Sequence, residues 1–144
     1  MKILIINGPN LNMLGTREPE IYGSRTLQDV CNDLKKYVNE IDNTIELEFF
    51  QSNHEGEIVD KIQKSGDFNG LIINPAAYTH TSVAIPDAIK AVNLKAVEVH
   101  LSNVAAREDY RKISFVSEAC IATVAGFGED SYKLAFLGLY NKIK

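Results

Sequence analysis

Residues 3–12 decide the fold: Ile3-Leu4-Ile5-Ile6-Asn7-Gly8-Pro9-Asn10-Leu11-Asn12 is an apolar run that stops abruptly in a polar, turn-forming loop. Such a run is typical of a buried parallel strand, and open α/β sheets bind their ligands beyond the carboxyl ends of parallel strands. The loop continues through Arg17, Pro19 and Tyr22-Gly23, so it holds amides, a guanidinium and a phenol. This mixture indicates proton chemistry more than a structural turn.

Short apolar runs alternate with segments of helical period along the rest of the chain. The apolar runs predict strands at residues 2–7, 45–50, 70–74, 95–101 and 119–125. Their Ile, Leu and Val residues do not alternate strictly with polar ones, as expected for strands covered on both faces. The apolar residues that recur every three or four positions predict helices over 27–41, 55–65, 82–92 and 130–142. Gly66 should stop the second helix, and Pro86 should kink the third or mark the start of its regular part.

Alternating strands and helices predict an α/β fold. Right-handed crossovers restrict such a chain to a doubly wound parallel sheet, and with five strands the flavodoxin-like order 2-1-3-4-5 is the natural choice. The switch point then lies between the first and third strands, so the loops that follow them should share one crevice. The length of 144 residues and the 45% hydrophobic content suit a single domain over 1–144.

Composition excludes several classes of protein. The net charge of −4 argues against a nucleic-acid binder, although a local positive pocket could still bind an anion. The four apolar residues before Asn7 are too few for a signal peptide or a membrane span, so we expect a cytoplasmic protein. Cys31, on the apolar face of a predicted helix, and Cys120, on a predicted strand, should be small core residues, not ligands or a disulfide.

Glu98 and His100 are two residues apart on the fourth predicted strand, so their side chains should project from the same face of the sheet. A carboxylate beside an imidazole fixes the ring and favours its protonated form. The pair therefore predicts an acid that works near neutral pH at a strand end.

Four blocks of sequence, in one order, resemble type II 3-dehydroquinate dehydratase, a cofactor-free enzyme family that dehydrates 3-dehydroquinate to 3-dehydroshikimate by anti elimination. The first block is Asn7-Gly8-Pro9-Asn10-Leu11-Asn12 with Leu14-Gly15 and the Arg17-to-Gly23 motif. The other blocks span residues 74–82, 98–103 and 107–111. The resemblance covers nearly the whole chain.

This resemblance assigns the catalytic roles. Tyr22 is implied to be the base. Because a phenol with a pKa of about 10 is a poor base at neutral pH, Arg17 is implied to lower the pKa of Tyr22 by its positive charge. His100, paired with Glu98, is implied to be the acid that protonates the departing hydroxyl. Asn10, with an ordered water, would stabilise the enolate oxygen.

The resemblance also assigns substrate binding and assembly. The implied binding residues are Asn74, His80, Asp87, Leu101, Ser102 and Arg111. Asp87 would reach the site of a neighbouring chain, which implies a homo-oligomer, a dodecamer assembled from trimers. Arg107 is expected to order the loop of Arg17 and Tyr22 or to form a surface ion pair, and is not counted as catalytic.

No metal or cofactor is expected, because no Cys, His and carboxylate cluster has ligand spacing. A flavodoxin-like fold by itself is also compatible with three other functions. A phosphate-receiving domain needs acidic residues where this chain has Asn7 and Asn74. A flavin or nucleotide carrier needs a different loop after the first strand. The third, a binding module that holds an anionic ring compound without turnover, remains the alternative. For an enzyme, the sequence leaves open whether it serves biosynthesis in the shikimate pathway or quinate breakdown.

Overall fold

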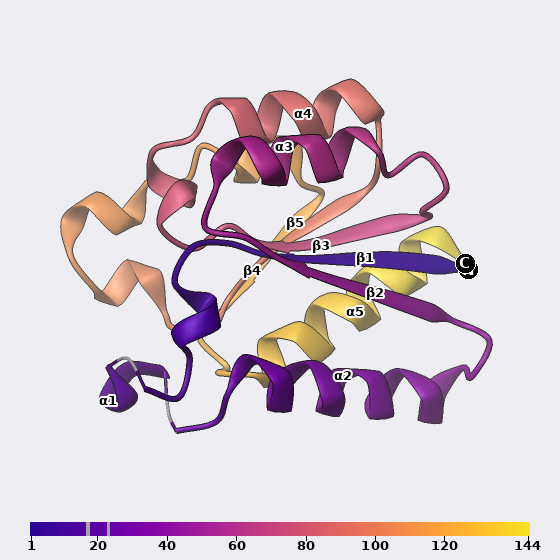
Figure 1. Cartoon of the computed structure of the whole chain (residues 1–144), viewed down its shortest axis with the longest axis horizontal. Helices are drawn as coiled ribbons and strands as arrows, with labels where there is room; N and C mark the ends of the chain where they lie inside the picture. Colours follow the sequence, from indigo (N-terminus) through magenta and orange to yellow (C-terminus); the bar gives the residue numbers. More distant parts are fainter. Residues whose placement is uncertain (17, 23) are drawn as a thin grey trace.

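The computed structural model describes residues 1–16, 18–22 and 24–144, and it contains a five-stranded parallel sheet with the order β2-β1-β3-β4-β5 (Figure 1). The strands are β1 (Lys2–Asn7), β2 (Glu46–Gln51), β3 (Gly70–Asn74), β4 (Ala96–His100) and β5 (Ala122–Ala125). The predicted fold class and strand order are therefore confirmed. The alternation of strand and helix, together with right-handed crossovers, was sufficient to predict them.

Helices cover both faces of the sheet. They are α1 (Pro19–Tyr22), α2 (Leu27–Ile41), α3 (Glu55–Gln63), α4 (Ala84–Val92) and α5 (Asp130–Ile143). Figure 1 shows α3 and α4 over one face, and α2 and α5 over the other. Alternate residues of β1 pack on opposite faces of the sheet. Ile3 and Ile5 pack toward α2 and α5, whereas Leu4 and Ile6 pack toward α3 and α4. Of the described helices, none is long and apolar enough to cross a membrane.

The helix bounds differ slightly from the predicted ones, for local reasons. Helix α3 ends at Gln63, three residues before Gly66, where the Ser65 hydroxyl donates to the carbonyl of Ile62. Helix α4 begins at Ala84, not at residue 82, because the hydroxyl of Ser82 accepts the N–H of Ile85 at 3.0 Å and replaces a helical bond. Pro86 falls in the first turn of α4, where proline needs no intrahelical partner.

The segment between β4 and β5 was predicted least well. It forms three short 3-10 helices, η3 (Val104–Ala106), η4 (Asp109–Lys112) and η5 (Ser117–Ala119). The predicted strand at 119–125 therefore begins only at Ala122, and Cys120 lies before it. The reason is local: Ala119 and Cys120 donate to the carbonyls of Val116 and Ser117, so their N–H groups are bonded within a turn.

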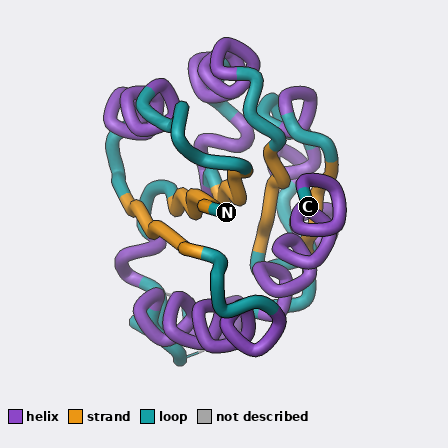
Figure 2. Tube along the Cα trace, turned by 90° about the vertical axis from the view of Figure 1, so that its right-hand side faces the viewer, coloured by secondary structure: helices purple, strands orange, loops and turns teal. Residues whose placement is uncertain are grey.

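The loops after β1 and β3 meet at the carboxyl end of the sheet. The N–H of Gly8 donates to the carbonyl of Asn74 at 2.8 Å. A Cβ atom on Gly8 would lie 2.5 Å from the carbonyl oxygen of Pro75, so only glycine permits this approach. Figure 2 looks onto the opposite end of the molecule, where both termini lie. The predicted switch point between the first and third strands is therefore where these loops close together.

Candidate active site

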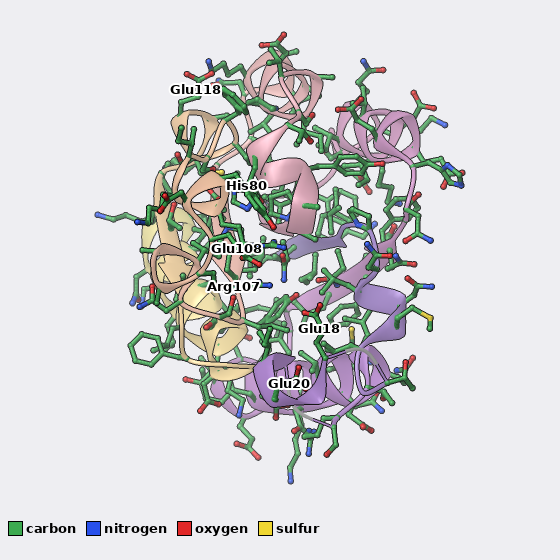
Figure 3. The ribbon with its side chains drawn as sticks, turned by 90° about the vertical axis from the view of Figure 1, so that its left-hand side faces the viewer. Glu18, Glu20, His80, Arg107, Glu108 and Glu118 are labelled. Carbon is green, nitrogen blue, oxygen red and sulfur yellow. The ribbon has the colours of Figure 1, made fainter. Side chains whose placement is uncertain are left out.

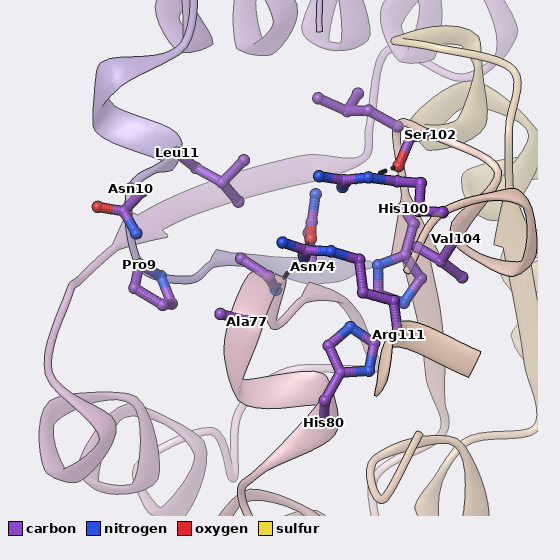
Figure 4. Close-up of a pocket in the computed structure, with 13 residues that line it drawn as sticks. Pro9, Asn10, Leu11, Asn74, Ala77, His80, His100, Ser102, Val104 and Arg111 are labelled. Atoms are coloured by element: carbon purple, nitrogen blue, oxygen red, sulfur yellow. Dashed lines mark hydrogen bonds between the residues drawn. The ribbon is translucent and has the colours of Figure 1, made fainter. Parts of the chain in front are cut away.

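A pocket with an empty volume of about 530 Å³, partly open to solvent, lies at this end of the sheet (Figure 4). Its walls come from the loops after β1, β3 and β4. Among the predicted site residues, those that line it are Asn10, Asn74, His80, His100, Leu101, Ser102 and Arg111. The pocket thus brings together residues from separate motifs of the sequence. Arg17 lies outside the described residues, as does the side chain of Tyr22.

Glu98 and His100 form a buried pair on β4, as their spacing predicted. Nε2 of His100 lies 2.6 Å from Oε1 of Glu98, and both side chains are almost inaccessible to solvent. His100 lines the pocket, whereas Glu98 is held behind it. Since a carboxylate only accepts, Nε2 donates the proton of this bond, and the pair fixes the orientation of the ring. Glu98 is therefore a positioning residue for His100.

Two hydroxyl groups that the sequence did not single out hold Glu98 in turn. The Ser114 hydroxyl lies 2.9 Å from Oε1 and 3.0 Å from Oε2 of Glu98. Thr123, the partner of Glu98 in the β4–β5 register, donates to Oε2 at 3.4 Å. Ser114 is sixteen residues from Glu98 in the chain, within a loop, so no periodic pattern could have indicated it. A fully buried carboxylate is tolerated because donors surround it.

Removing the Ser114 hydroxyl is expected to slow turnover. Ser114→Ala should lower kcat about tenfold and leave KM unchanged, because Ser114 contacts Glu98 and not the pocket. Ser114→Thr keeps a hydroxyl and should restore the rate. Ser117→Ala is the matched control, since its hydroxyl donates to the backbone carbonyl of Ser114. Steady-state kinetics and thermal unfolding of the variants measure this, and wild-type kcat in Ser114→Ala would contradict it.

Asn10 is held in a backbone conformation that few residues other than glycine adopt. Its φ angle is 68°, in the left-handed region, where asparagine is tolerated better than most residues. Its N–H donates to Oδ1 of Asn53 at 3.0 Å, and the same oxygen accepts from Gln51 at 3.2 Å. Gln51 also donates to the carbonyl of Gly8 at 3.2 Å. The last residue of β2 and a residue just after it thus fix the loop that follows β1, and sequence reasoning did not identify them.

His80 has a defined tautomer. Its Nδ1 lies 2.7 Å from the carbonyl oxygen of Ile113. A carbonyl can only accept, so Nδ1 carries a proton. In the neutral ring, Nε2 is then an acceptor, which suits a hydroxyl donor on a ligand. Figure 4 shows the rings of His80 and His100 on the same side of the pocket as Arg111.

Two arginines line the pocket, and each lies close to a glutamate that is not among the described lining residues. Arg111 donates to Glu108 at 2.7 Å, and its side chain is 17% exposed. Arg107 donates to the Ser102 hydroxyl at 3.4 Å and lies 3.9 Å from Glu18. Figure 3 looks onto this face and shows Arg107, Glu108 and Glu18 near its centre. Arg107 therefore contacts the loop that contains Tyr22, as expected for a residue that orders this loop, and it also lines the pocket.

Asp87 is exposed on α4 and is not among the described residues that line the pocket. The carboxylate of Asp87 therefore lies outside the pocket of its own chain. The two cysteines are partly buried and unbonded. Burial raises the pKa of Cys31 to about 11, and burial together with the nearby charge of Glu98 raises that of Cys120 to about 12. Both thiols are thus protonated at neutral pH. Within the described ranges, no group of three His, Cys, Asp or Glu side chains could hold a metal ion.

Comparisons with known proteins match nearly the whole chain to one family. The family model of class II dehydroquinases matches residues 1–140. The 3-dehydroquinate dehydratase of Geotalea daltonii is 56% identical over 145 residues, which cover 100% of this chain and 99% of that protein. That of Clostridium beijerinckii is 55% identical and covers 96% of this chain and 95% of its own. The crystal structure of type II dehydroquinase from Butyrivibrio crossotus has a TM-score of 0.93 at 46% identity, covering 97% of both chains.

The fold and the pocket define an α/β enzyme whose site lies at the switch point of a doubly wound sheet. The chain belongs to the class II dehydroquinase family. The resemblance inferred from its four sequence blocks is therefore confirmed.

Proposed function

We propose that this chain dehydrates 3-dehydroquinate to 3-dehydroshikimate in the shikimate pathway, in the cytoplasm, by an anti elimination through an enolate. The observation that carries the proposal is the buried Glu98–His100 pair beside a pocket that also holds Arg107 and Arg111. A positive pocket suits a substrate with a carboxylate, and an oriented imidazole suits the loss of a hydroxyl group. The identity of 56% to a protein named for this reaction supports the same substrate.

The acid half of the reaction falls to His100. The substrate is a β-hydroxy ketone, so the hydroxyl leaves as water once it receives a proton. His100 donates that proton, and Glu98 stabilises the ring while it is charged. Because Nε2 is bonded to Glu98, Nδ1 is the atom that faces the reaction. Ser114 and Thr123 keep the carboxylate in place through the cycle.

The base half falls to Tyr22, with Arg17 beside it. The phenolate removes the proton alpha to the ketone, and the electron pair moves onto the carbonyl oxygen to give the enolate. Arg17 stabilises the phenolate by its charge. Contact of Arg107 with Glu18, in the same loop, supports a position for this loop over the pocket. Asn10 and an ordered water donate to the enolate oxygen.

Substrate binding falls to the remaining side chains of the pocket. Arg111 and His80 contact ring hydroxyls, with Nε2 of His80 as the acceptor. Asn74, Ser102 and the backbone at Leu101 bind the carboxylate and the remaining hydroxyl. Arg107 adds positive charge beside Ser102. No cofactor takes part in this scheme. An imine would need a lysine, and the described residues that line the pocket include none.

A direct assay tests the proposed function. The product contains a conjugated double bond, so incubation of the chain with 3-dehydroquinate should raise the ultraviolet absorbance with time. The rate should survive a metal chelator, and borohydride added with substrate should not modify a lysine. A chain that binds the substrate without any rise in absorbance would instead be the binding module considered above. Covalent trapping on a lysine would overturn the mechanism.

Assembly is part of the proposal: Asp87 completes the site of an adjacent copy, within trimers that build a dodecamer. Its exposure on α4, outside its own pocket, supports this role. Asp87→Ala should lower kcat/KM about tenfold or more, because a hydrogen bond to a charged group is lost. Asp60→Ala, an exposed carboxylate on α3, is the control. Steady-state kinetics combined with size-exclusion chromatography and light scattering measure the effect. A fully active monomer at high dilution would contradict the prediction.

A further inference from the structure

A buried tyrosine on α5 is hydrogen bonded to a residue of the pocket. Tyr132 is 2% exposed, and its hydroxyl donates to Oδ1 of Asn7. Nδ2 of Asn74 donates to the same hydroxyl at 3.0 Å. Asn7 and Asn74 are paired in the register of β1 and β3, so the tyrosine bridges two neighbouring strand ends. Asn74 lines the pocket, whereas Tyr132 is not among its described lining residues.

The direction of these bonds is fixed by chemistry. Burial raises the pKa of Tyr132 well above its ordinary value, so the hydroxyl stays protonated. A phenol has one proton to donate, and the carbonyl oxygen of Asn7 accepts it. The Tyr132 oxygen can therefore only accept from Asn74. The amide of Asn74 must turn its nitrogen, not its oxygen, toward the tyrosine.

The other end of the Asn74 amide is fixed as well. Its Oδ1 accepts the N–H of Ala76 at 3.1 Å, the bond drawn in Figure 4. With the oxygen held by Ala76 and one N–H held by Tyr132, the second N–H is the donor that Asn74 can offer to a molecule in the pocket. An asparagine without these partners could rotate by half a turn and present its oxygen instead.

We infer that Tyr132 is a positioning residue, which fixes Asn74 as a hydrogen-bond donor toward substrate oxygen atoms. This inference rests on the proposed function, because it assigns the direction of one substrate contact. A substrate that carries a carboxylate and hydroxyl groups presents acceptor oxygens, and a donor at Asn74 suits them. The ring of Tyr132 packs in the hydrophobic core, yet its hydroxyl contacts two asparagine side chains.

Tyr132→Phe is the test, because it keeps the ring and removes only the hydroxyl. KM for 3-dehydroquinate should rise about tenfold, equivalent to about 1.4 kcal/mol, while kcat changes less than about threefold. A purely structural role would reduce the amount of folded protein, and so the apparent kcat, without raising KM. Tyr140→Phe is the matched control: it lies on the same helix, and its hydroxyl contacts Asp42, not the pocket.

A second variant keeps the test decisive if the first is poorly folded. Asn7→Leu combined with Tyr132→Phe removes the acceptor that Tyr132→Phe would leave unpaired, and still leaves Asn74 without its partner. It should show the same rise in KM. In an Asn74→Ala background, Tyr132→Phe should change KM by less than about twofold, since the two residues act as one unit. Wild-type KM in folded Tyr132→Phe protein would overturn the inference alone, whereas a wild-type chain without dehydratase activity would overturn the proposed function as well.

Discussion

Tyr22→Phe is expected to lower kcat by about three orders of magnitude or more, which is the scale of a lost general base. The substitution keeps the aromatic ring and removes only the ionisable oxygen, so substrate binding should stay within about tenfold of wild type. Turnover is followed by the absorbance of the product, and binding by calorimetry with the inactive variant. A low kcat with nearly unchanged binding would show that only the base is lost, whereas weak binding would show that the site itself is disrupted.

The control for this variant is Tyr37→Phe. Tyr37 lies on α2, where its ring packs edge-on against Phe136 at 6.5 Å between ring centres, remote from the pocket-lining residues. It should retain wild-type kcat and KM. Substantial turnover by Tyr22→Phe would remove Tyr22 as the base and leave the acid half of the mechanism standing.

His100→Gln is expected to lower kcat by about two to four orders of magnitude, with a small change in KM. Glutamine can still donate to Glu98, so the buried carboxylate keeps a partner and the protein should fold. The departing hydroxyl, however, no longer receives a proton from a positioned acid. Stopped-flow or steady-state absorbance measurements determine kcat, and circular dichroism checks the fold.

His54→Gln is the matched control, because His54 is exposed at the start of α3 and its side chain makes no capping bond. It should behave as wild type. If His100→Gln kept more than about a tenth of the wild-type kcat, His100 could not be the acid, since a positioned acid contributes at least about a hundredfold. The kcat of Glu98→Gln should lie between those of His100→Gln and His54→Gln, because His100 remains but loses its charged partner.

The sequence by itself determined the order of the sheet, the place of the pocket and the pairing of one lining residue, His100, with the buried carboxylate behind it. Apolar runs and helical spacings are local patterns, and the handedness of crossovers converts them into one topology. Glu98 and His100 could be paired because a strand turns alternate side chains to the same face. The roles of Arg17 and Tyr22 came from the family motif alone, and they stay predictions because neither guanidinium nor phenol lies within the described residues.

Only the tertiary structure decided which groups hold these residues in place. Ser114 contacts Glu98, Asn53 fixes Asn10 from the loop after the neighbouring strand, and Tyr132 bonds to Asn7, which is 125 residues away in the chain. No repeating pattern in the sequence indicates such contacts. The hydroxyl or amide groups lie in loops or on a helix, and their partners are determined by which segments the fold places next to them. The 3-10 helices between residues 104 and 119 were missed for a different reason. They are held by short local bonds, such as those from the N–H of Ser117 to the Ser114 hydroxyl and from the N–H of Ala119 to the carbonyl of Val116, and they are too short to show a period in the sequence.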